Sequence, residues 1–172
     1  MKTSKRSSQK ARDLYEVQHS GYALSRIVNQ TPELCIAAVQ YCPDTLTDVN
    51  DKIRASCHYP EICLAAVMRN STMLKNVDRD TQYNHPEICL AAVWYDGQAL
   101  QFVSYELYYD YIARRNDHYL HICMAAVRND RNALTFVPGI MRKMHPEIEA
   151  EADKTPRRVH LPPKCSKLYP EL

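Results

Sequence analysis

One eight-residue motif recurs along the chain and constrains its fold more than any other feature. It reads Pro-Glu-Leu-Cys-Ile-Ala-Ala-Val at 32–39, and close copies begin at Pro60, at Pro86 and at Leu120, the last without the Pro-Glu start. Successive copies begin 28, 26 and 34 residues apart, and a fifth start, at Pro146, then turns charged. Repetition at this period predicts one small structural unit that stacks on its neighbours.

A second signature follows each copy, with Leu 14 and Val 17 residues after the proline position, as at Leu100 and Val103. The same template placed at Lys10 finds apolar residues, so a degenerate repeat opens the array. We therefore predict a helical repeat domain at 10–153, between a basic N-terminal arm at 1–9 and a Pro-rich basic C-terminal tail at 154–172. Its parts are a cap repeat at 10–30, full repeats at 31–58, 59–84, 85–118 and 119–144, and a truncated helix at 145–153.

Each unit has the features of a helical hairpin. Proline suits the first position of a helix because its missing N–H would be unpaired there, and glutamate in the first turn complements the helix dipole. Thr31 precedes Pro32 and is a predicted N-cap. The motif is then apolar on every side, so its helix needs cover from both neighbouring units. The fold class that follows is all-α, a short α-solenoid of stacked hairpins of about 26 residues, in which the Leu-x-x-Val signature forms a shorter second helix.

The combination of P-E-[IL]-C-[IL]-A-A-V with A-L-x-x-V, clearest at 86–103, resembles the domain-of-unknown-function-4116 repeats. The resemblance covers roughly 31–137. Repeats of that family occur in bacterial, protist and giant-virus proteins, including suspected host-directed effectors. The resemblance implies no shared catalytic activity, and the role it implies is an interaction surface.

Composition removes several classes of protein. Only three glycines are present, none close to another, so the glycine-rich loops of dinucleotide and P-loop sites are absent. The longest apolar run, 88–95, has eight residues and is too short to span a membrane. The basic N-terminus lacks the apolar core of a secretory signal, and the odd count of seven cysteines does not suit a disulfide framework. We expect an intracellular, cytoplasmic protein, or one that acts inside a host cell or virion.

The cysteines and histidines are candidates for a metal, redox or catalytic site. Four cysteines share one repeat position, where a metal or redox ladder is one reading and small buried hydrophobes at a tight helix contact the other, which we favour. His118 and His121 could share a helical face near Cys123, but no His-Glu-x-x-His motif or second ligand cluster accompanies them. No nucleophile stands beside an evident base. We therefore predict no enzyme activity, no metal and no cofactor.

The third full repeat is eight residues longer than the second, and the extra length falls in a tyrosine- and arginine-rich segment at 104–115. Insertions in repeat arrays often mark the binding face, and Tyr and Arg are frequent in interface hot spots. The alternative is a lengthened helix whose tyrosines only pack on the next repeat. The candidate partner-binding residues here are Tyr105, Tyr108, Tyr109, Tyr111, Arg114 and Arg115.

A second candidate surface follows each Ala-Ala-Val, where the residues differ between copies while the core residues do not. Trp94, the only tryptophan, and Tyr95 are its best anchors. Together the two surfaces predict a non-enzymatic protein–protein interaction scaffold or adaptor with a protein partner. A host-directed effector and a component of a viral or mobile-element assembly are two forms that such a protein could take.

Charge is distributed unevenly. Residues 1–12 carry +5 and residues 154–172 carry +4, so the formal +2 of the chain leaves −7 for the part between. Basic ends can contact nucleic acid, which gives an alternative function as a nucleic-acid-associated module. Its candidate residues are Lys5, Arg6, Lys10, Arg157 and Arg158. The sequence leaves the oligomeric state open.

Overall fold

The computed structural model describes residues 2–155, with side chains from residue 9 onward except at Gly21. Every regular element in that part of the chain is helical, so the all-α prediction is confirmed. The predicted boundary between an N-terminal arm and a cap repeat falls inside one helix, because α1 runs without a break from Lys2 to His19. The remainder of the predicted C-terminal tail, 156–172, lies outside the described residues.

The repeating unit has three parts instead of the two expected of a hairpin. A long α-helix carries the motif, a six-residue 3₁₀ helix carries the Leu-x-x-Val signature, and a further short α-helix completes the unit. The motif helices are α2 (Pro32–Tyr41), α4 (Tyr59–Arg69), α6 (Pro86–Tyr95) and α8 (His118–Asn129). The 3₁₀ helices are η2 (Pro43–Asp48), η3 (Ser71–Asn76), η4 (Gly97–Phe102) and η5 (Arg131–Phe136), with η1 (Gly21–Arg26) after α1. The short α-helices are α3 (Asp51–Arg54), α5 (Arg79–Asn84), α7 (Tyr105–Arg114) and α9 (Gly139–Met144), and α10 (Pro146–Lys154) ends the series.

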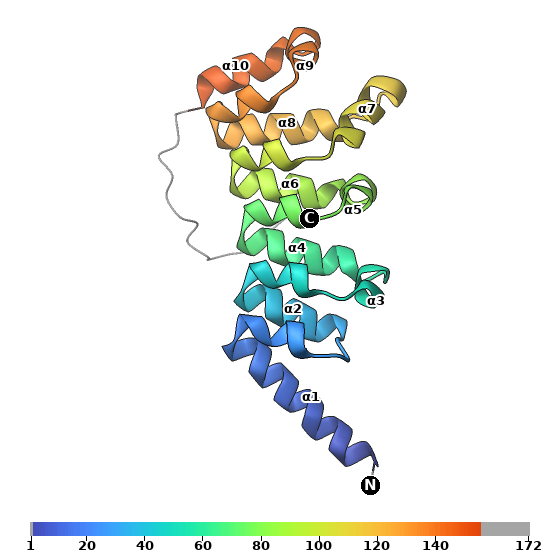
Figure 1. The fold of residues 1–172 in the computed structure, drawn as a ribbon. Helices are drawn as coiled ribbons and strands as arrows, with labels where there is room; N and C mark the ends of the chain where they lie inside the picture. The colour runs from blue at the N-terminus through green and yellow to red at the C-terminus, as the bar shows by residue number, and fades with distance from the viewer. Residues whose placement is uncertain (1, 156–172) are drawn as a thin grey trace.

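These helices stack in the order of the chain. Each motif helix packs on the one before and the one after it, from α1 through α2, α4, α6 and α8 to α10 (Figure 1). The 3₁₀ helices form a second row, since η1 to η5 also contact one another in order. The short helices α3, α5, α7 and α9 lie along one edge of this elongated stack, and α10 ends at the opposite edge (Figure 1). The helices therefore form one continuous all-α stack, and the α-solenoid stays a prediction.

Local sequence explains the starts and ends of the motif helices. Proline occupies the first turn of α2, α4, α6 and α10, and the Thr31 hydroxyl accepts the N–H of Leu34, as the N-cap prediction required. At the far end, Asn70, Asp96 and Asp130 hold one repeat position, and each side chain accepts the N–H two residues later. These caps turn the chain from the α-helix into the 3₁₀ helix, because Asn and Asp bond readily to a following backbone N–H.

The core of the stack is built from the same motif positions in each repeat. The Cys, the second Ala and the Val are fully buried in all four copies. Gly97 has a specific role in this packing, because a Cβ there would collide with the backbone carbonyl of Ala126 in the next motif helix. A side chain at this position would therefore push α8 away from η4.

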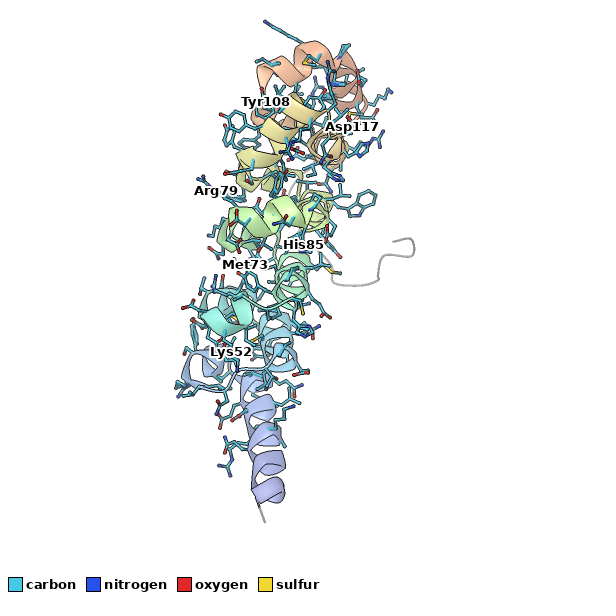
Figure 2. The ribbon with its side chains drawn as sticks, turned by 90° about the vertical axis from the view of Figure 1, so that its right-hand side faces the viewer. Lys52, Met73, Arg79, His85, Tyr108 and Asp117 are labelled. Atoms are coloured by element: carbon cyan, nitrogen blue, oxygen red, sulfur yellow. The ribbon has the colours of Figure 1, made fainter. Side chains whose placement is uncertain are left out.

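The inserted residues of the third full repeat lengthen the third element and not the second. Helix α7 has ten residues, against four in α3 and six in α5 and α9. It begins at Tyr105, and the preceding Ser104 is its N-cap, because the Ser104 hydroxyl accepts the N–H of Glu106. Figure 2 views the edge that carries it, with Lys52 of α3, Arg79 of α5 and Tyr108 of α7 at successive levels.

Candidate binding groove between helices α7 and α9

A groove of about 400 Å³ opens beside α7 on the edge of the stack. Its α7 side is formed by tyrosines and one isoleucine, and α9 supplies the other apolar side chains. The lining residues are Tyr108, Tyr109, Tyr111, Ile112, Arg115, Ile140 and Met144. We call this set the α7/α9 groove. Its volume is at the lower end of the range for sites that bind small ligands or short segments, roughly 300–1,000 Å³.

Helix α7 is amphipathic, and this divides its tyrosines between core and surface. Leu107, Asp110 and Tyr111 are buried, whereas Tyr105 and Tyr109 are 68% and 65% exposed. The ring of Tyr109 lies 5.8 Å from the ring of Tyr108, centroid to centroid, so the two form one continuous aromatic surface. The groove thus has an exposed aromatic wall fixed to a buried helical face.

A buried carboxylate fixes the C-terminal half of α7. Asp110 accepts hydrogen bonds from the Tyr83 hydroxyl at 3.2 Å and from the Asn116 amide at 2.9 Å. The Arg114 guanidinium pairs with the same carboxylate at 3.4 Å. Three partners from α5, α7 and the following turn satisfy this acid, so it has a structural role.

The floor of the groove is tied to the next repeat. The Tyr111 hydroxyl is hydrogen-bonded to Nε2 of His145, whose Nδ1 lies 2.6 Å from the Glu147 carboxylate. A backbone N–H and then the His145 ring hold the pKa of Glu147 below its ordinary value. This chain of contacts fixes α7 against the start of α10, and so fixes the distance that the groove spans.

Arg115 ends α7 in the left-handed backbone region, with φ 56° and ψ 36°. It is the one non-glycine residue with positive φ in the described part of the chain. Its side chain is exposed and lines the groove, and none of the described acidic residues forms an ion pair with it. The groove therefore carries a cation that is free within residues 2–155.

Some of the binding residues predicted for the insertion line the groove, and others do not. Tyr108, Tyr109, Tyr111 and Arg115 meet at the groove, although Tyr111 is only 2% exposed and forms its floor. Tyr105 is exposed at the start of α7 but does not line the groove, and Arg114 is paired with Asp110. Sequence reasoning missed Ile112, Ile140 and Met144. The four-residue spacing of Ile140 and Met144 was a usable signal, because it puts both on one face of a helix.

The second predicted surface lies elsewhere. Trp94 is 64% exposed at the C-terminal end of α6, and Tyr95 beside it is half-buried. The Asn129 amide donates to the backbone carbonyl of Trp94, and its carbonyl oxygen accepts the N–H of Gly97 at 3.1 Å. Trp94 and Tyr95 do not line the α7/α9 groove, so the structure does not join the two predicted surfaces into one site.

The residues of the nucleic-acid alternative are only partly described. Lys10 is exposed on α1, the side chains of Lys5 and Arg6 are outside the described part, and Arg157 and Arg158 lie beyond it. That alternative stays a prediction.

The repeated cysteines are buried in the stack and unpaired. Burial raises the pKa of Cys35 to about 11 and those of Cys63, Cys89 and Cys123 to about 12, so these thiols are protonated at neutral pH. Their surroundings alternate along the chain. The thiols of Cys35 and Cys89 donate to a glutamine carbonyl oxygen, while Tyr59 and Tyr119 lie against Cys63 and Cys123. A protonated, packed thiol is a poor nucleophile and metal ligand.

The other contacts of those glutamines explain why they are buried. The Gln82 amide donates to the backbone carbonyls of Leu74 and Val77, both at 3.1 Å, and its carbonyl oxygen accepts the N–H of Ser104 at 2.8 Å. The Gln30 amide likewise donates to two backbone carbonyls, of Leu24 and of Asp48 in the next repeat, and its carbonyl oxygen accepts the N–H of Asn50. Each glutamine therefore joins two successive repeats through their backbones, a role that the sequence analysis did not foresee.

Within residues 2–155, no group of three or more His, Cys, Asp or Glu side chains is arranged to hold a metal ion. None of the described helices combines the length and the apolar character needed to cross a membrane. The resemblance to the domain-of-unknown-function-4116 repeats rests on the motif residues alone and stays a prediction. Comparisons of the chain with models of known protein families, with curated proteins and with solved structures find no match.

Proposed function

We propose that this protein is a non-enzymatic scaffold or adaptor that binds a protein partner through the α7/α9 groove. The observation that carries the proposal is where exposed apolar side chains gather. Of the large hydrophobic side chains exposed in the described part of the chain, five lie on α7 and α9: Tyr105, Tyr109, Ile112, Ile140 and Met144. A clustered exposed apolar surface marks an interaction site, whereas isolated apolar residues are ordinary.

The rigidity of the groove supports the same function. Its walls are short helices held by buried contacts, Asp110 on one side of α7 and Tyr111 with His145 on the other. A preformed surface loses little conformational entropy when a partner binds, which favours affinity from a small contact area.

A photocrosslinking amino acid at Tyr109 tests the proposal in the native source cells. The matched control places the same amino acid at Tyr41, which is also an exposed tyrosine but lies on α2. We expect crosslinked protein products at position 109 and none at position 41. Adding Ile140→Asp to the first variant should remove the products. The aspartate is hydrated in the free protein, and a bound partner would bury it and remove its hydration, which costs free energy.

Ile140 is exposed, so this change should leave the fold intact, which circular dichroism would check. Equal products at positions 41 and 109, or products that persist with Ile140→Asp, would contradict the proposed function.

A further inference from the structure

The proposed function leaves the chemistry of the partner open, and the charges around the α7/α9 groove narrow it. We propose that the groove binds an extended peptide segment with an apolar side chain and a nearby carboxylate, and that this carboxylate pairs with Arg115. This inference rests on the proposed function and adds the partner's chemical class.

The backbone at Arg115 is the first argument. Its left-handed conformation is one that glycine or asparagine adopts easily at the end of a helix and that arginine adopts only at a cost. The neighbouring Arg114 has a partner in Asp110, whereas no described acidic group pairs with Arg115. The Arg115 guanidinium therefore makes no hydrogen bond or ion pair within the described residues that would stabilise the fold. Its side chain lies beside the apolar lining of the groove.

The other charged side chains of α7, of α9 and of the start of α10 are paired, except for Lys143. On α7, Asp110 is buried among three partners and Glu106 pairs with Arg79 at 3.5 Å. On α9, Lys143 is exposed and Arg142 pairs with Glu149 at 3.7 Å. At the start of α10, Glu147 is held by His145.

Asp117, which precedes α8, is exposed and makes no ion pair with Arg115, and it does not line the groove. Among the residues that line the groove, Arg115 alone is charged, so the charge of the lining is positive and complements a carboxylate.

The shape of the groove and its hydroxyl groups indicate an extended segment. About 400 Å³ accommodates a short stretch of chain. The hydroxyls of Tyr108 and Tyr109 make no hydrogen bond within the described residues, so both are available as donors. An extended peptide leaves its backbone carbonyls unpaired and offers acceptors to such groups.

A displayed library of short random peptides tests the inference, since it requires no knowledge of the natural partner. We expect the full-length protein to enrich peptides in which Asp or Glu lies within a few residues of an apolar residue. Arg115→Gly should keep the apolar preference and lose the acidic one, and Arg115→Lys should retain part of it. For a selected peptide, replacement of its acid by the matching amide should weaken binding to the wild-type protein roughly tenfold.

The variants distinguish a failure of this inference from a failure of the proposed function. Arg115→Gly relieves the left-handed backbone, so it should not unfold the protein, and a raised melting temperature would confirm this. Enrichment of apolar peptides without an acid, or an acid preference that survives Arg115→Gly, would overturn this inference and leave the proposed function standing. No enrichment over an Ile140→Asp control would overturn both.

Two other occupants have distinct signatures. A concentration-dependent dimer that Ile140→Asp dissociates in analytical ultracentrifugation would assign the groove to a second copy of the chain. A gain in peptide binding on removal of residues 156–172 would assign it to the chain's own tail. Either result would overturn the proposal of a peptide from a partner, whereas a monomer whose peptide binding is unchanged by that removal would support it.

Discussion

The motif helices and the short helices along the edge of the stack follow different rules, although both belong to the same repeats. In α2, α4, α6 and α8 the cysteine, the second alanine and the valine are fully buried in each copy. The short helices have four, six, ten and six residues in order and differ in composition. A motif helix has neighbours on both sides that fix its side chains, whereas an edge helix has a free side. The free side can vary without loss of packing, and the candidate groove lies there.

The sharpest test of this contrast compares one residue type in the two regions. Ile88 of the α6 motif is 1% exposed, and Ile140 of α9 is 56% exposed. Ile88→Ala should lower the free energy of unfolding by roughly 2–5 kcal/mol, because it leaves a cavity between packed helices. Ile140→Ala should change it by less than about 0.5 kcal/mol while weakening partner binding. Urea denaturation followed by circular dichroism measures both; similar losses would show that the edge is as constrained as the stack.

The contact between stack and edge is tested by Gln82→Ala. This change removes the partners of two backbone carbonyls and of the Ser104 N–H, all in a buried setting. We expect a loss of about 2–3 kcal/mol in unfolding free energy. Gln101→Ala is the matched control, because that exposed amide bonds only to the Gln98 carbonyl, and it should cost little. If the two variants were equally stable, Gln82 would not be what joins α5 to the start of α7.

How much the sequence predicts differs between the same two regions. The all-α fold follows from the motif, because helices that are apolar all round must be covered by other helices. The third helix of each unit does not follow, since segments as short as Asp51–Arg54 hold too few residues to show a helical period. The sequence therefore predicted residues on the α7 side of the groove but not those on the α9 side. Tyr109 and Arg115 stood out by composition, but Ile140 and Met144 belong to a helix that forms only on the stack.

Alkaline pH offers a test confined to the motif helices. Burial raises the pKa of Cys89 from an ordinary value of 9.0 to about 12, so the unfolded chain releases this proton at lower pH than the folded one. The stability that the neutral thiol supplies is complete below about pH 9 and is lost as the pH rises toward 12.

At about pH 10 the loss should reach roughly 1 kcal/mol for this thiol. The unfolding free energies of the wild type and of Cys89→Ala should therefore converge by that amount between pH 8 and pH 10, since only the wild type has this proton to lose. A constant difference across that range would show that the thiol is not buried in solution.

The smallest expected change in unfolding free energy concerns two adjacent arginines, Arg114 and Arg115. Replacement by glycine should change the free energy of unfolding in opposite directions at the two positions. Arg115 has a left-handed backbone, so Arg115→Gly should raise the unfolding free energy by about 0.5–1 kcal/mol, net of the greater freedom of glycine in the unfolded chain. Arg114 is the last residue of α7 and pairs with Asp110, so Arg114→Gly should lower it by about as much. Thermal melts of the two variants measure the difference. Suppose that Arg115→Gly is more stable than the wild type and no longer prefers acidic peptides. Arg115 would then lower the stability of the fold while it supplies a cation beside the groove. A destabilised Arg115→Gly variant would instead make Arg115 part of the fold and remove the contrast between stack and edge at this residue.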